Sequence, residues 1–115
     1  MKLNYNRSLI VHLFHIFFVG GLFLYMGIHK NSAPSWIYYV LLFLGIGVIS
    51  AHGFKLIKNR YSLVSWFHVL IVAPLVLYIG YTGAHAPQVA YQLILGAGIL
   101  AIADHAYWLI RGTFF

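Results

Sequence analysis

The sequence contains no cysteine and one acidic residue, Asp104. The absence of cysteine excludes disulfides, thiolate metal sites and a cysteine nucleophile. A single acid argues against metal centres built from several carboxylates. Charged residues make up 7% of the chain, against about 25% in soluble domains. Because so few charges cannot cover a water-exposed surface, we expect a lipid bilayer to surround most of this chain.

The positive charge is concentrated at the edges of apolar segments. Seven Lys and Arg residues against one acid give a formal net charge of +6. Basic residues that flank apolar spans indicate membrane topology and contacts with lipid headgroups. No basic face is interleaved with aromatics, so nucleic acid is not expected as a partner. Motifs for phosphate loops, nucleophile elbows and HExxH zinc sites are absent, and we expect no enzymatic activity.

Four segments are long and apolar enough to span a membrane, which requires about 20 residues each. These are residues 8–28, 36–57, 62–81 and 88–110. Pro34 and Pro87 lie near the first turn of the second and fourth segments, where a missing N–H costs little. No small-residue cleavage site interrupts the first segment, so it is predicted to be a spanning helix and not a signal peptide. The pattern predicts one all-α domain over residues 1–115, an integral membrane four-helix bundle.

The distribution of basic residues predicts the orientation. Only Lys30 falls on one side of the predicted membrane. The other side carries Lys2, Arg7, Lys55, Lys58, Arg60 and Arg111. The positive-inside rule therefore places both termini of this multi-pass protein on the cytoplasmic side.

The chain is an internal repeat with a shift of 53 residues. Without a gap, 17 of the 44 positions from Phe14 to Ile57 are identical to those of the second copy. The matches include His15 with His68 and His52 with His105. Repeat 1 covers about residues 8–57 and repeat 2 about residues 61–110. Because each copy has two helices, we predict two tandem hairpins with the same orientation and a pseudo-twofold axis along the membrane normal.

Matched residues of the second helix form one stripe with helical spacing. Gly45 and His52 are seven residues apart on this stripe, as are Gly98 and His105. Small residues permit close approach of helices in lipid. We therefore expect the second and fourth helices to meet near Gly45 and Gly98, with the histidines facing inward.

The four matched histidines are predicted to lie at one depth. Relative to Pro34, His15 is 19 residues earlier and His52 is 18 residues later, and His68 and His105 have the same spacing from Pro87. At about 1.5 Å per residue, all four fall in one layer near the cytoplasmic side. An ionisable side chain inside a membrane is by default a candidate functional residue.

Three uses of this histidine layer compete. In the first, His15, His52, His68 and His105 bind a haem-like tetrapyrrole such as haem b, or a transition metal such as Cu, Zn or Fe, for electron transfer. In the second, they form the proton-binding part of an oligomeric proton or cation channel, since histidine titrates near neutral pH. In the third, they only hydrogen-bond neighbouring helices within a structural membrane protein of a virion or larger complex.

Two further residues are candidates for a proton or ion pathway. His12 precedes His15 by one turn, although its repeat partner is Ser65. Asp104 neighbours His105 in the sequence and is suited to orient a histidine of another helix or to pair with Arg111.

A resemblance to a known group of proteins comes from three stretches of the first repeat. These are YMGI from Tyr25, PSWIYYVLLFLGIGVI from Pro34, and HGFKL from His52. They resemble small membrane proteins encoded by giant viruses of algae and related marine sequences. The resemblance covers most of the chain and implies a viral origin, without implying an activity.

Overall fold

The computed structural model of the protein describes residues 9–114, and this part of the chain is helical, without a β-strand. Lys2 and Arg7, which entered the predicted orientation, lie outside the described residues. Four helices are long and apolar enough to cross a membrane, as the sequence predicted. They cover Leu9–Ser32, Ser35–Lys58, Leu63–His85 and Gln88–Gly112.

The first and third of these helices each contain a π-helical turn and end in a 3₁₀ turn, which the sequence did not predict. The first includes η1 (Phe14–Val19), α2 (Gly20–His29) and η2 (Lys30–Ser32). The third includes α4 (Leu63–Phe67), η3 (His68–Val72), α5 (Ala73–Thr82) and η4 (Gly83–His85). The second and fourth are the long helices α3 (Ser35–Lys58) and α6 (Gln88–Phe114).

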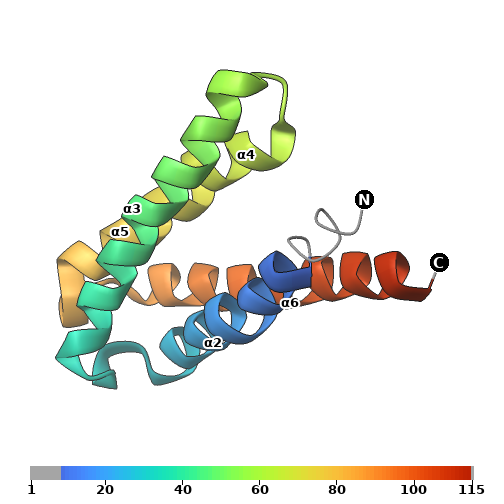
Figure 1. Ribbon diagram of the computed structural model, residues 1–115. Helices are drawn as coiled ribbons and strands as arrows, with labels where there is room; N and C mark the ends of the chain where they lie inside the picture. The colour runs from blue at the N-terminus through green and yellow to red at the C-terminus, as the bar shows by residue number, and fades with distance from the viewer. Residues whose placement is uncertain (1–8, 115) are drawn as a thin grey trace. The chain divides into compact units, whose positions relative to one another are not determined.

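The chain forms two compact units that do not coincide with the two repeats. Among the described residues, unit 1 comprises residues 9–28 and 92–114, and unit 2 comprises residues 29–91. Unit 1 therefore combines the first helix of repeat 1 with the second helix of repeat 2. In unit 2, α3 runs alongside α4, η3 and α5 (Figure 1). Each unit thus pairs two helices that come from different repeats.

Within unit 2, helix packing depends on two glycines that face leucines of the opposite helix. A Cβ added at Gly45 would lie 2.6 Å from the side chain of Leu77. A Cβ added at Gly80 would lie 2.9 Å from the side chain of Leu42. Real Cβ atoms do not approach so closely, so both positions require glycine at this helix separation.

Unit 1 is packed in the same way at the matching positions. A Cβ added at Gly27 would collide with Leu95, and one added at Gly98 would lie 2.9 Å from the Cβ of Phe23. Gly27 matches Gly80, and Leu42 matches Leu95, each 53 residues further along the chain. The repeat therefore encodes one kind of helix–helix contact, and each unit contains it once.

Two tyrosines in contact with each other link the 3₁₀ turns η2 and η4 of unit 2. The hydroxyls of Tyr38 and Tyr91 lie 3.0 Å apart. Tyr38 Oη also lies 3.2 Å from the carbonyl oxygen of Lys30, and Tyr91 Oη lies 3.1 Å from that of Gly83, so the two hydroxyl hydrogens are shared among three contacts. Lys30 and Gly83 both have positive φ angles, 52° and 66°. This backbone conformation brings both carbonyls to the tyrosines at the cost of strain at Lys30, which is not glycine.

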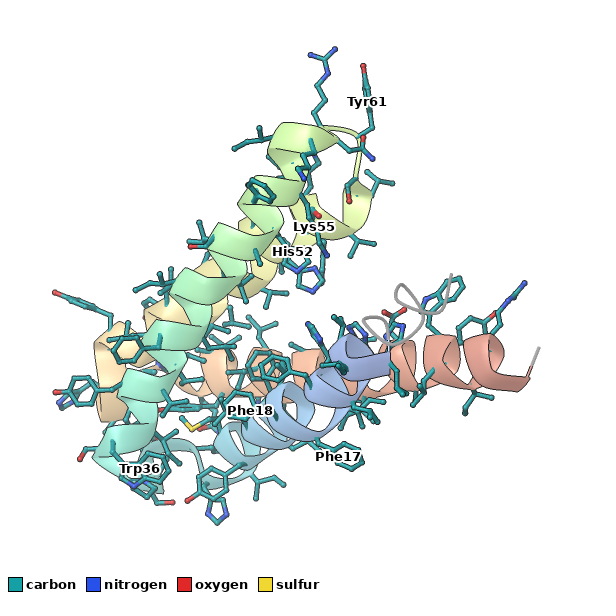
Figure 2. The ribbon with its side chains drawn as sticks, viewed as in Figure 1. Phe17, Phe18, Trp36, His52, Lys55 and Tyr61 are labelled. Atoms are coloured by element: carbon teal, nitrogen blue, oxygen red, sulfur yellow. The ribbon has the colours of Figure 1, made fainter. Side chains whose placement is uncertain are left out.

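Large apolar side chains cover the outside of both units. Phe43 is 76% exposed and Ile57 is 84% exposed. Phe17 and Trp36 are likewise exposed, at 73% and 63% (Figure 2). Apolar surface spread so widely over helices of this length is typical of contact with lipid.

Candidate functional site

The π-helical turns begin at or next to a histidine of each unit. In η1, the backbone N–H of Gly20 bonds the carbonyl of His15, five residues earlier. In η3, the N–H of Ala73 bonds the carbonyl of His68 in the same way. Pro74 follows Ala73 directly and supplies no N–H, which favours an irregular turn at this point of the third helix. Turns of this kind occur frequently at functional sites.

His15 and His68 are held in the same orientation by their own helices. His15 Nδ1 lies 2.8 Å from the carbonyl oxygen of Val11, and His68 Nδ1 lies 2.7 Å from that of Val64. Because a carbonyl oxygen can only accept, Nδ1 of each ring carries the hydrogen. In the neutral form of each ring, Nε2 is then the unprotonated nitrogen.

Each of these rings stacks on a histidine of the paired helix. In unit 1, the rings of His15 and His105 have centroids 4.2 Å apart and planes 21° from parallel. In unit 2, His52 and His68 have centroids 4.1 Å apart and planes 11° from parallel. The four matched histidines therefore form two face-to-face pairs, one in each unit, and the two rings of a pair lie at the same level.

A third polar residue completes each pair, and it differs between the units. In unit 1, His12 Nδ1 lies 2.8 Å from His105 Nδ1, so one of the two rings donates a hydrogen bond to the other. In unit 2 the matching residue is Ser65, whose Oγ lies 3.3 Å from His52 Nδ1. Ser65 is 1% exposed. Its hydroxyl also accepts a hydrogen bond from Ser62.

The two candidates for a proton or ion pathway lie in different surroundings. His12 contacts His105 directly and so belongs to the histidine cluster of unit 1. Asp104 is exposed on α6 and does not lie in the stack of His15 and His105. Arg111, the partner suggested for Asp104, donates a hydrogen bond to the hydroxyl of Tyr107.

Gly45 and Gly98, which were predicted to bring the second and fourth helices together, each face a bulky residue within their own unit. Gly45 faces Leu77 of α5, and Gly98 faces Phe23 and Leu24 of α2. Each glycine of the stripe therefore accommodates a bulky residue from the first helix of a repeat. Glycine facing a large side chain fills the space between helices better than two glycines facing each other.

The geometry of the pairs is unfavourable for ligation of one metal by both rings. A metal ion lies in the plane of an imidazole, about 2 Å from the nitrogen. Two rings stacked face to face cannot both direct a nitrogen at an ion, or at a haem iron, placed between them. Among residues 9–114, no group of three or more His, Cys, Asp or Glu residues is arranged to hold a metal ion.

Comparison of the chain with protein families, with curated proteins and with solved structures finds no match. The resemblance to membrane proteins of giant algal viruses therefore stays a prediction. The functional conclusion depends on the histidine pairs themselves.

The sequence identified the histidines, but two features of the site and one of the fold were not predicted. The π-turns leave no pattern in the sequence beyond Pro74 in one copy. Ser65 was visible only as the repeat partner of His12. The pair of Tyr38 and Tyr91 was present among the matched residues, but only the fold shows that the two hydroxyls meet.

Proposed function

We propose that the four helices span a membrane as two tandem hairpins, related by a pseudo-twofold axis along the membrane normal. The recurrence of packing and histidine contacts at a shift of 53 residues supports this arrangement. Both termini and the turn near Asn59 then face the cytoplasm. The basic residues Lys55, Lys58 and Arg60 at that turn support this orientation.

Within this arrangement, the protein acts as a small proton-responsive channel whose histidine pairs sense acidification. The observation that carries the proposal is the face-to-face stacking of His52 on His68, repeated in His15 and His105. Histidine gains a proton within the physiological pH range. A stacked pair accommodates one proton, because a neutral ring attracts an imidazolium through its π face.

A second proton makes the stack unfavourable. Two unit charges about 4 Å apart repel by about 4 kcal/mol at the effective dielectric constant typical of proteins. This exceeds the stacking energy of two rings, which is about 1 kcal/mol. The stack therefore excludes a second proton, whereas separated rings can bind one each, so acidification favours separation of the rings and of the paired helices at the level of the histidines. The π-turn at His68 contains one residue more than an α-turn, so it offers a place where the helix can rotate.

In each unit a third polar residue, His12 or Ser65, contacts the histidine pair on its cytoplasmic side. His12 is hydrogen-bonded to His105 and can share its proton. Ser65 offers His52 a hydroxyl that forms a hydrogen bond but does not hold a charge. We therefore expect the two units to respond to acid differently, with unit 1 able to hold more protons.

The test is ion flux through liposomes that contain the purified protein, with the pH lowered from about 7.5 to about 5.5. We expect the flux to rise on acidification. The double variant His52→Phe/His105→Phe keeps a flat ring in each stack but cannot be protonated, and its flux should no longer depend on pH. His85→Phe, an exposed histidine in η4 outside both pairs, is the matched control. A wild-type flux that is independent of pH would exclude this function.

Tetrapyrrole or metal binding is the second candidate, and one observation favours it. In His15 and His68, the hydrogen bond from Nδ1 to a backbone carbonyl leaves Nε2 as the metal-binding nitrogen of the neutral ring. Histidine ligands of metals are commonly oriented by such a bond. His15 or His68 would hold such a group without a second ligand from the partner ring. An absorption spectrum of the purified protein with metal analysis tests this candidate, and a preparation with neither a Soret band nor a stoichiometric metal would rule it out.

A further inference from the structure

The turn between α3 and α4 is a rigid platform that carries three cations. Lys55 and Lys58 lie in the last turn of α3, and Arg60 follows two residues later. The N–H of Asn59 bonds the carbonyl of Lys55 at 2.8 Å. The indole N–H of Trp66 bonds the carbonyl of Arg60 at 2.7 Å. These bonds fix the backbone on both sides of the turn.

Two of the three cations are held in place by aromatic rings. Lys58 Nζ lies 4.7 Å from the ring centroid of Phe54. The guanidinium of Arg60 lies 5.2 Å from the ring centroid of Tyr61 and donates a hydrogen bond to its hydroxyl at 3.1 Å. Contact with a ring face restrains a long side chain without consuming all its N–H donors. The exposed cations are therefore partly ordered before any ligand binds.

This positive charge has no counter-charge in its own part of the chain. Residues 29–91 contain no Asp or Glu, and the one acid of the sequence is Asp104. Lys55, Lys58 and Arg60 lie close together along the chain and repel one another. This excess of positive charge at the turn favours an anion as its ligand.

We infer that this turn binds the phosphate headgroup of an anionic phospholipid. The platform lies at the end of the apolar helix Ser35–Lys58, so it would meet the bilayer at headgroup level. Tyr61, which is labelled in Figure 2 and is 75% exposed, is of a residue type that occupies this interface, and so is Trp66. The aromatic rings would face the acyl chains, and the three cations of the turn would face the phosphate. The inference rests on the proposed membrane insertion but not on the proposed proton response.

The expected gain in affinity for an anionic lipid depends on the number of cations at the turn. Near a negatively charged membrane surface, each Lys or Arg strengthens binding by roughly fivefold. Removal of two cations should therefore weaken the affinity for an anionic lipid by roughly thirtyfold.

The experiment measures binding of short-chain phosphatidylglycerol to the full chain in a neutral detergent, with short-chain phosphatidylcholine as the uncharged comparison. The wild type should bind the first and not the second. The double variant Lys58→Gln/Arg60→Gln should lose most of this binding. The double variant Lys30→Gln/Arg111→Gln removes the same net charge elsewhere and should bind like the wild type.

Two further measurements separate a lipid contact from a folding defect and from a site for free phosphate. Lys58→Arg/Arg60→Lys keeps both charges and should retain binding, whereas a turn that merely unfolds on substitution would lose it. Inorganic phosphate at the same concentration should not compete, because it lacks the acyl chains. Equal weakening in both charge-removing double variants, binding of both lipids alike, or full competition by inorganic phosphate would each overturn the inference.

Discussion

The imidazole rings of His52 and His68 lie face to face, with centroids 4.1 Å apart, although the two residues belong to different repeats. His15 and His105 make the same contact in unit 1. Each pair thus joins a π-turn in the first helix of one repeat to the regular second helix of the other. Stacking places two titratable groups so close together that their charge states depend on each other.

Replacement of His68 by phenylalanine should remove the acid sensitivity of unit 2 without loss of its packing. At neutral pH we expect a change in unfolding free energy within about 1 kcal/mol, since one flat ring replaces another. At about pH 5.5, the variant should be more stable than the wild type, because the stacked pair of the wild type excludes a second proton that its unfolded chain binds. Thermal unfolding in detergent at both pH values measures this. Equal acid sensitivity of the two proteins would contradict the prediction.

Removal of the Ser65 hydroxyl should destabilise the protein. Ser65→Ala takes away the partner of His52 Nδ1 in a position that is 1% exposed. We expect a loss of about 1 kcal/mol from the free energy of unfolding. Ser50→Ala, in an exposed position on α3, is the control and should be close to neutral. Denaturant titration followed by circular dichroism compares the two, and similar values for both would refute a structural contribution of the hydroxyl.

Two glycines of α6 should respond oppositely to alanine. At Gly98 a Cβ would lie 2.9 Å from the Cβ of Phe23 and 3.2 Å from the backbone nitrogen of Leu24. Gly98→Ala should therefore cost about 1–3 kcal/mol of stability. At Gly96 a Cβ would meet nothing within 4 Å, and Gly96→Ala should stabilise the helix by up to about 1 kcal/mol. Thermal unfolding of the two variants checks both signs, and a neutral Gly98→Ala would show that this helix contact is loose.

The hydroxyl of Tyr38 should stabilise the outer turns of unit 2. It contacts both the carbonyl of Lys30 and the hydroxyl of Tyr91, so Tyr38→Phe removes a polar partner from each. We expect a loss of about 1–3 kcal/mol. Tyr39→Phe changes a neighbour that is 66% exposed and should have little effect. Hydrogen exchange at the turn around Lys30 gives a local readout, and unchanged exchange in Tyr38→Phe would contradict the prediction.

The four helices and the matched histidines could be predicted from composition, periodicity and the internal repeat. Few charges and long apolar runs predicted four helices, because unpaired backbone groups cannot be left in lipid. The repeat identified His15, His52, His68 and His105 as matched positions, and the proline spacing predicted one layer for all four. Within each stacked pair the two rings do lie level with each other. These properties depend on local geometry, which a helix fixes residue by residue.

The partners of those residues could not be predicted in the same way. The apolar character of a helix in lipid does not show which neighbour it packs against, since lipid and protein surfaces are similarly apolar. The choice of Leu77 opposite Gly45, and of Leu95 opposite Gly27, follows from shape complementarity in three dimensions.

The order of residues along the chain was thus enough to specify the helices, the internal repeat and the residues that carry polar chemistry. It did not specify that helices of different repeats pair, that the histidines stack in twos, or that Ser65 takes the place of His12 beside its histidine pair. Those properties arise in the folded chain. Helix formation is set by hydrogen bonds within a segment, whereas pairing depends on how the side chains of two segments fill the space between them.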